Sequence, residues 1–160
     1  AEGPLFLLAI IIAVRFSYGK GLMLAVNALL VLGVTTFLKH IIFDGVIRPS
    51  VFFDGKVTLN FVEGLEVLRH NSFPSGHTAG AFGAFCMLSL LVTNKKWSYL
   101  FFTVALLVGI SRVYLLQHFF RDVYAGSLVG VVVSSVFYLT FVRTGWYNNL
   151  HWKDKALLKK

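Results

Sequence analysis

Charged side chains are scarce in this chain. They make up 14% of its 160 residues, whereas a soluble domain carries about a quarter. Hydrophobic residues make up 57%, and the mean hydropathy is +0.75. This composition excludes an ordinary soluble domain and indicates a membrane protein.

Metal-binding patterns are also missing from the sequence. Cys86 is the single cysteine, so no intrachain disulfide can form and no cysteine cluster is available to bind zinc. The chain has no HExxH motif and no pair of carboxylates suited to Mg²⁺. We therefore predict a function that needs no metal ion and no cofactor.

Long apolar runs, by contrast, are frequent. Four of them approach the roughly 20 residues that cross a bilayer as a helix, namely residues 21–38, 78–93, 97–110 and 123–142. Residues 4–14 form a shorter run, which we interpret as a trimmed fifth span. A cleaved signal is disfavoured because Arg15 and Lys20 follow this run instead of preceding it. The sequence thus predicts an all-α, polytopic transmembrane helical bundle, a single domain over residues 1–160, with residues 44–75 as an ordered extracytoplasmic loop.

The net charge of +8 is distributed unevenly along the chain. With five spans the loops alternate between two sides, and the whole positive excess falls on the side that includes the basic tail, residues 151–160. The positive-inside rule makes that side cytoplasmic. We therefore predict no nucleic-acid partner and place the chain in a bacterial inner membrane, with its other side facing the periplasm or exterior. The tail is predicted either to contact anionic lipid headgroups or to be solvated.

Polar residues on the non-cytoplasmic side fall in three clusters. Polar groups at membrane depth are costly, so their positions carry information. The span count alone brings all three clusters to one face of the membrane, and this convergence is the strongest indication of a functional site. The clusters are Lys39 with Arg48-Pro49, Ser75-Gly76-His77, and Ser111-Arg112 with His118 and Asp122.

The third cluster contains a spaced histidine and aspartate. His118 and Asp122 are four residues apart, so on a helix they share a face and the carboxylate can orient one imidazole nitrogen. The other nitrogen is then available as a base or nucleophile. The alternative is a structural pair that satisfies two half-buried polar groups.

The second cluster suits an oxyanion. Pro74 is typical of a first helical turn, so Ser75, Gly76 and His77 would lie among the unpaired backbone N–H groups of a helix N-terminus. The alternative is an ordinary helix start with an interfacial histidine.

Cations accompany both of these clusters. Lys39, Arg48 and Arg112 carry positive charge that matches a tetrahedral dianion, although each alone could also anchor the chain at the membrane interface. Taken together, the three clusters favour a metal-free phosphoryl-transfer site, in which cations replace the metal as stabilisers of charge.

Three motifs resemble the signatures of one family. They are Arg48-Pro49, "PSGH" at Pro74 to His77, and "SRVYLLQHFFRD" at Ser111 to Asp122. They look like the motifs of the type 2 phosphatidic acid phosphatase family of membrane lipid phosphatases, which share a site with vanadium haloperoxidases and bacterial acid phosphatases. The resemblance spans residues 39–122.

The resemblance implies a role for each of the clustered residues. His118 would attack phosphorus to form a phosphohistidine, Asp122 would orient it, and His77 would protonate the leaving oxygen. Water would then hydrolyse the phosphoenzyme. The groups implied to hold the phosphate are Lys39, Arg48, Arg112, Ser75 and the Gly76 amide.

Two features depart from the family pattern. The family usually has six residues between its lysine and Arg-Pro, whereas Lys39 and Arg48 enclose eight, "HIIFDGVI". A bulge that includes Asp44-Gly45 could still deliver the lysine. The family also tends to have six spans, and this chain shows five at most, which fits a missing or trimmed first helix.

From the clusters and the resemblance we predict an integral membrane lipid phosphate phosphatase with its site on the outer face. Its partners would be the bilayer and a lipid substrate: lipid A 1-phosphate, undecaprenyl diphosphate, phosphatidylglycerol phosphate or phosphatidic acid. One alternative is a non-enzymatic transporter or anion-binding protein that holds phosphate without cleaving it. A vanadate-dependent, oxidant-producing enzyme is disfavoured by the membrane context. The sequence leaves the oligomeric state open.

Overall fold

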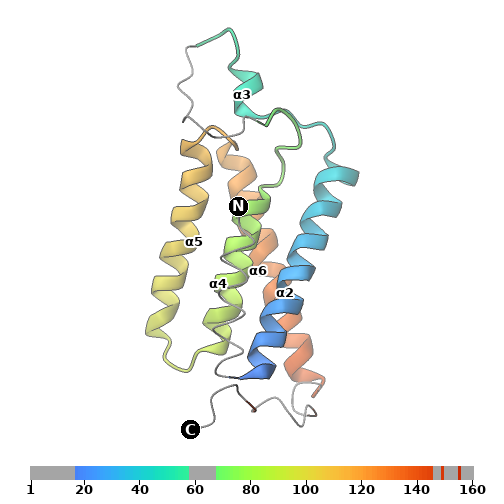
Figure 1. Cartoon of the computed structure of the whole chain (residues 1–160), viewed down its shortest axis with the longest axis vertical. Helices are drawn as coiled ribbons and strands as arrows, with labels where there is room; N and C mark the ends of the chain where they lie inside the picture. Colours follow the sequence, from blue (N-terminus) through green and yellow to red (C-terminus); the bar gives the residue numbers. More distant parts are fainter. Residues whose placement is uncertain (1–16, 58–67, 146–148, 150–154, 156–160) are drawn as a thin grey trace.

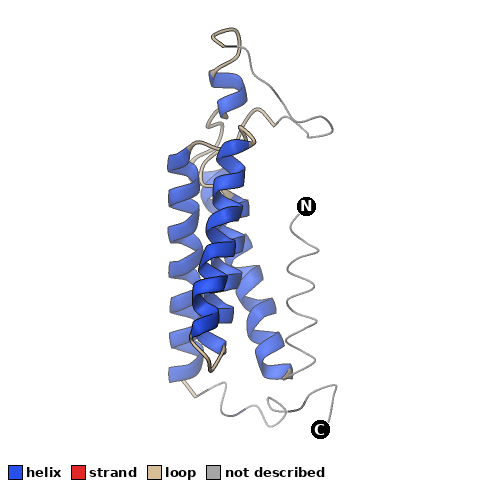
Figure 2. Ribbon diagram, turned by 90° about the vertical axis from the view of Figure 1, so that its left-hand side faces the viewer, coloured by secondary structure: helices blue, strands red, loops and turns tan. Residues whose placement is uncertain are grey.

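The computed structural model describes residues 17–57, 68–145, 149 and 155, and every regular element in these residues is helical. Four long helices lie side by side along the long axis of the molecule (Figure 1, Figure 2). The π-helical turn Leu38–Ile42 continues the first of them, and a short helix lies in the loop that follows. The elements are α2 (Tyr18–Phe37), α3 (Pro49–Phe52), α4 (Gly76–Leu91), α5 (Lys96–Tyr114) and α6 (Phe120–Arg143).

Three of the described helices are long and apolar enough to cross a membrane: α2 with its π-helical turn, α5 and α6. They cover the predicted spans 21–38, 97–110 and 123–142. The predicted span 78–93 corresponds to α4, whose 16 residues extend about 24 Å, less than the roughly 30 Å of a hydrocarbon core. The predicted fifth span, residues 4–14, lies outside the described residues.

Helix α4 is the centre of the bundle and packs against α2, α5 and α6. Glycines on α6 allow the closest of these contacts. A Cβ atom at Gly126 would lie 2.5 Å from the carbonyl oxygen of Ser75, and one at Gly130 would overlap the carbonyl oxygen of Ala79. Small residues at such a spacing let membrane helices approach backbone to backbone. This close approach fixes the height of α4 against α6, and with it the start of α4.

Polar side chains reinforce the middle of the bundle. The backbone carbonyl of Gly83 in α4 accepts hydrogen bonds from the Asn27 amide of α2 at 3.1 Å and from the Ser134 hydroxyl of α6 at 3.0 Å. All three residues are buried. Hydrogen bonds between helices of this kind help to hold a bundle together where lipid tails provide no hydrophobic driving force.

Apolar side chains close the end of the bundle that lies opposite α3, around the buried Met23, Leu24 and Met87. Partly buried residues of α4 and α6 pack against these three, namely Leu88, Leu91, Phe137, Tyr138, Phe141 and Val142.

The outer faces of the bundle are apolar as well. Leu29, Leu107 and Val132 expose 68%, 59% and 57% of their surface, on α2, α5 and α6 respectively. Such faces are unfavourable in water but suit lipid. The prediction of an all-α transmembrane bundle is confirmed.

The two ends of the bundle carry different residues. Lys20, Lys95, Lys96 and Arg143 lie at the ends of helices on one side, whereas the turns that follow α2 and α5 and precede α4 and α6 meet at the other, where α3 also lies (Figure 1). The loop at this second end is ordered in its described arms, because Arg48 N donates to Arg69 O at 3.0 Å. As the span count predicted, all three polar clusters are gathered at this end.

Candidate active site

Arg48 ties the three clusters together. Its side chain is buried, and its guanidinium donates to three backbone carbonyls: Nε to His70 at 2.9 Å, one Nη to Gln117 at 3.0 Å and the other to Asn71 at 3.3 Å. Burial lowers the pKa of Arg48, which Asp122 partly offsets, yet an arginine stays protonated in proteins. Arg48, which was predicted to bind phosphate, therefore also links the loop, the segment before α4 and the turn before α6.

His118 and Asp122 form a buried pair. His118 is 2% exposed and Asp122 is fully buried, and Nδ1 of the histidine lies 3.7 Å from Oδ2 of the aspartate. The expected shared helix is wrong in one respect, because His118 precedes α6 while Asp122 sits in its first turn. The aspartate accepts the backbone N–H of Phe119 at 3.0 Å, so the carboxylate caps α6 and faces the imidazole at the same time.

Ser72, which was not among the predicted site residues, contacts both members of this pair. The hydroxyl of Ser72, itself fully buried, donates to Oδ2 of Asp122 at 2.5 Å and lies 3.5 Å from Nδ1 of His118. The pKa of His118 is lowered by burial, against the opposing effect of Asp122. A lowered pKa keeps the imidazole neutral at physiological pH, which is the form that a nucleophile requires.

The second cluster departs from the prediction in detail. Helix α4 begins at Gly76, with Ser75 as its N-cap and Pro74 outside the helix, not in its first turn. The Ser75 hydroxyl is fully buried and accepts hydrogen bonds from the N–H and the hydroxyl of Thr78, at 3.4 and 2.9 Å. Ser75 is therefore engaged as a helix cap in this structure. The amide of Gly76 belongs to the first turn, whose N–H groups have no carbonyl acceptor within the helix.

Lys39 reaches the start of α4 despite the longer spacing to Arg48. Its Nζ lies 3.7 Å from the position that a Cβ at Gly76 would occupy. The π-helical turn Leu38–Ile42 contains Lys39 and, with the turn around Gly45, absorbs the extra residues. The irregular backbone at this point therefore begins before Asp44, in the π-helical turn, and continues to Gly45, whose φ is positive.

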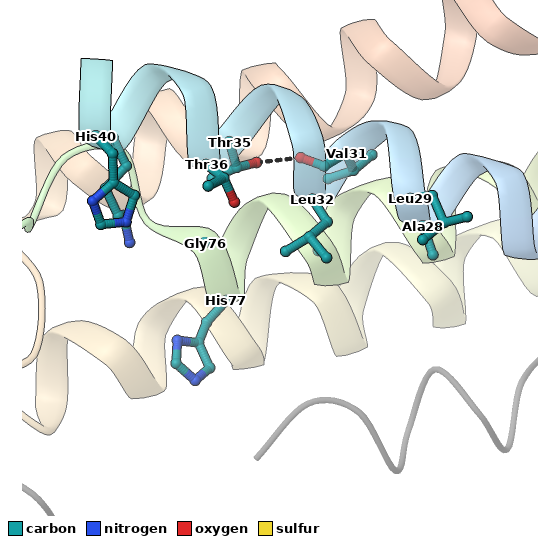
Figure 3. Close-up of a pocket in the computed structure, with 11 residues that line it drawn as sticks. Ala28, Leu29, Val31, Leu32, Thr35, Thr36, His40, Gly76 and His77 are labelled. Carbon is teal, nitrogen blue, oxygen red and sulfur yellow. Dashed lines mark hydrogen bonds between the residues drawn. The ribbon is translucent and has the colours of Figure 1, made fainter. Parts of the chain in front are cut away.

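A cavity of about 490 Å³ opens beside Lys39, between α2 and α4. Its polar end is formed by Lys39, His40, Gly76 and His77, and Figure 3 shows the imidazoles of His40 and His77 toward the same end of the two helices. The remaining walls are mostly apolar side chains of α2, including Leu29.

Arg112 occupies the last turn of α5. Its Nε donates to the Ser111 hydroxyl at 3.2 Å, and one Nη donates to the side-chain oxygen of Gln117 at 3.1 Å. His77 lies within electrostatic range of Arg112, His118 and Lys39, so residues of all three clusters lie near one another. Among the described residues, no group of three or more His, Cys, Asp or Glu side chains is placed to hold a metal ion.

Comparison with known proteins identifies the family. A model of the PAP2 superfamily matches residues 20–146. The chain belongs to the PAP2 superfamily. The resemblance inferred from the three motifs is thereby confirmed.

Relatives of this PAP2 chain include plant and bacterial enzymes. Lipid phosphate phosphatase 1 of Arabidopsis thaliana is 36% identical over 103 residues, which are 56% of this chain and 31% of that protein. Lipid A 1-phosphatase of Porphyromonas gingivalis is 35% identical over 86 residues, which are 52% of this chain and 18% of that protein. The matched part of the chain thus spans less than a third of the full length of either relative.

A solved structure shares the fold. The crystal structure of Aquifex aeolicus LpxE matches this PAP2 chain with a TM-score of 0.70 and 29% sequence identity, covering 85% of this chain and 77% of that one. The likeness supports a helical membrane bundle with the same arrangement of helices.

Sequence reasoning missed two residues that contact the site of this PAP2 chain. Ser72 lies two positions before Pro74, and Gln117 immediately precedes His118. Both are short-range neighbours of motif residues, yet neither has a charge or a periodic position that distinguishes it from an ordinary loop residue. Their importance follows from which acceptor and donor the fold places beside them.

Proposed function

We propose that this PAP2 protein is an integral membrane lipid phosphatase that works through a phosphohistidine on His118. The observation that carries the proposal is the buried array of Ser72, Asp122 and His118, which lies at the same end of the bundle as Lys39 and His77. A buried histidine with a lowered pKa and an oriented ring has the properties of a nucleophile.

The geometry supports a different role for each nitrogen of His118. Nδ1 faces Asp122 at 3.7 Å, so Nε2 is the atom that attacks. Nε2 forms a bond to phosphorus while the bond from phosphorus to the leaving oxygen breaks, and His77 gives that oxygen its proton. Water then attacks phosphorus and gives a proton to His77, and His118 leaves as a neutral imidazole. Asp122 stabilises the positive charge on the ring in the intermediate.

Cations would stabilise the phosphoryl group during transfer. Lys39 and Arg112 lie within electrostatic range of His77, and Lys39 and Arg48 within range of His118. Phosphoryl transfer depends chiefly on positioning and on such fixed charge. The Gly76 amide, at the positive end of α4, adds a backbone donor.

The cavity supports a lipid as the substrate. One end holds Lys39 and His77, whereas apolar side chains such as Leu29 and Leu32 form the walls between α2 and α4. An amphiphile would place its phosphate at the polar end and its chain along the walls. The candidates are lipid A 1-phosphate, undecaprenyl diphosphate, phosphatidylglycerol phosphate and phosphatidic acid.

The site is proposed to face the periplasm or exterior of a bacterial inner membrane. The basic ends of the helices, which carry Lys20, Lys95 and Lys96, lie opposite the site, as the positive-inside rule requires of the cytoplasmic side. A reporter fused after Lys160 should be cytoplasmic. An extracytoplasmic reporter would reverse the orientation and the side of the site with it.

Phosphate release from the four candidate lipids in detergent, with and without EDTA, tests the activity. We expect release from at least one lipid, unaffected by EDTA, and a loss of about three orders of magnitude or more in His118→Ala. Acid-quenched protein should carry phosphate that is absent from His118→Ala. A His118→Ala protein that matches wild type in phosphate release would refute the enzyme. If phosphate is bound but never released from a lipid, the protein is a transporter or anion-binding protein.

A further inference from the structure

Gln117 connects the two arginines of the site. Its backbone carbonyl accepts from Arg48 at 3.0 Å, and its side-chain oxygen accepts from Arg112 at 3.1 Å. The two contacts use different parts of one residue, so substitution of the side chain removes the contact to Arg112 and leaves the contact to Arg48 available.

Backbone hydrogen bonds hold the turn that contains Gln117. The carbonyl of Arg112 accepts the N–H groups of Gln117 at 3.1 Å and of His118 at 3.3 Å, and Leu116 donates to Val113 at 3.0 Å. This is the hydrogen-bond pattern of a Schellman motif at the end of α5. Leu116 has a positive φ of 55°, a conformation that this position of the motif usually gives to glycine. The turn places the side chain of Gln117 beside that of Arg112 and positions the backbone of His118.

The hydrogen bonds of Arg112 fix the direction of its guanidinium. Nε is held by the Ser111 hydroxyl and one Nη by Gln117, which leaves the remaining N–H donors of the planar fork for a ligand. A neutral amide is suited to this task, because a carboxylate at the same place would compete with a phosphate dianion for the arginine.

We propose that Gln117 is a positioning residue that orients Arg112 toward the phosphoryl group. This proposal rests on the proposed phosphatase function. Gln117 acts through preorganisation. An arginine that is already held in its binding orientation loses less conformational freedom when it forms hydrogen bonds to the phosphoryl group.

Three substitutions separate this role from a general effect on the turn. Gln117→Met keeps the length of the side chain without the acceptor, and Gln117→Glu keeps an acceptor but adds a negative charge. Leu115→Met is the control, because Leu115 lies in the same turn and is partly buried, and a swap that conserves volume is well tolerated.

We expect Gln117→Met to lower kcat/KM for phosphate release about 10-fold and to weaken inhibition by vanadate in parallel. Gln117→Glu should lose more, mostly through a raised KM. Leu115→Met should match wild type, and all three variants should have melting temperatures near that of wild type.

A double-mutant cycle with Arg112→Ala decides the point. If Gln117 acts through Arg112, Gln117→Met should cause no further loss in the Arg112→Ala background. The proposal is overturned if Gln117→Met is as active as wild type, or if it causes the same loss with and without Arg112. Wild-type activity in Arg112→Ala would overturn it as well, because Gln117 is proposed to act through Arg112. Wild-type activity in His118→Ala would instead refute the proposed function, so the two failures are distinguishable.

Discussion

The two ends of the bundle are built on different physical principles. At the end that carries Lys20 and Lys95, Met23, Leu24 and Met87 are buried among apolar neighbours, and packing alone holds them. At the opposite end, the outer end, where the three polar clusters lie, the buried side chains include Arg48, His118 and Asp122. Burial of such groups is unfavourable unless each finds partners, so this end is held by hydrogen bonds to backbone carbonyls and N–H groups.

The comparison explains why the outer end contains the irregular backbone. A π-helical turn, a positive φ at Asn71 and another at Leu116 all occur there. Regular helices use their own carbonyls and N–H groups, whereas the turns between them leave such groups available to buried side chains. Asn71 shows this directly, because its carbonyl accepts from Arg48. Substitutions in the hydrogen-bonded end and in the packed helix contacts should therefore change activity and stability to different extents.

The largest effect is expected at Arg48, where the two properties should fall together. Arg48→Lys keeps the charge, but the single nitrogen of lysine cannot reach the three carbonyls of His70, Asn71 and Gln117, which three different nitrogens of the guanidinium reach. We expect kcat/KM to fall about 100-fold or more and the free energy of unfolding to drop by about 2 to 3 kcal/mol, because a buried network is broken. Phosphate release and thermal unfolding in detergent measure the two losses.

Arg69→Lys is the matched control for this prediction. Arg69 is an exposed arginine of the same loop, and its substitution should change neither property. A stable but inactive Arg48→Lys would mean that Arg48 serves the ligand alone and does not hold the outer end together.

The next largest effect is expected at the contact between α4 and α6, where stability should fall while the catalytic rate stays the same. Gly130→Ala would place a Cβ against the backbone of Ala79 and 2.8 Å from the N atom of Gly83. Backbone atoms cannot move aside as a side chain can, so we expect a loss of about 3 kcal/mol, with near-normal activity per folded molecule.

Gly33→Ala controls for the change of residue type, since nothing lies within 4 Å of a Cβ at Gly33. It should leave stability equal or slightly raised, because alanine is the better helix former. Equal melting temperatures for the two variants would show that α4 and α6 do not depend on the close contact.

Much of the helical framework could be predicted from the sequence because it depends on local composition. Apolar runs gave the approximate limits of α2, α4, α5 and α6, and the alternation of sides brought the polar clusters together. The start of α4 differs in one detail, because Pro74 was predicted in the first turn, whereas Ser75 is the N-cap and Pro74 lies outside the helix.

The detailed contacts of the site could not be predicted because they depend on tertiary structure. A spacing of four residues between His118 and Asp122 is compatible with one helix, yet a loop residue followed by a helix N-terminus gives the same proximity. Arg48 was expected to hold phosphate, and its backbone acceptors come from residues that are 22 to 69 positions away. No pattern of neighbouring residues encodes such partners.

The smallest effect is expected at Ser72, and it tests whether the outer end is organised for chemistry or only for burial. Ser72→Ala removes the hydroxyl that donates to Oδ2 of Asp122, while the carboxylate keeps the N–H of Phe119. We expect kcat to fall about 10-fold with KM nearly unchanged, because in the proposed mechanism Asp122 orients the nucleophile and does not bind the substrate.

Ser50→Ala is the matched control, because Ser50 is also a buried serine of the outer end and donates to the carbonyl of Leu68 at 3.0 Å. If burial were all that mattered, the two substitutions would lower stability similarly and would leave kcat alone. A loss of kcat confined to Ser72→Ala, at equal melting temperatures, would show that hydrogen bonds at this end are arranged around His118 as well as around the cost of burying polar groups.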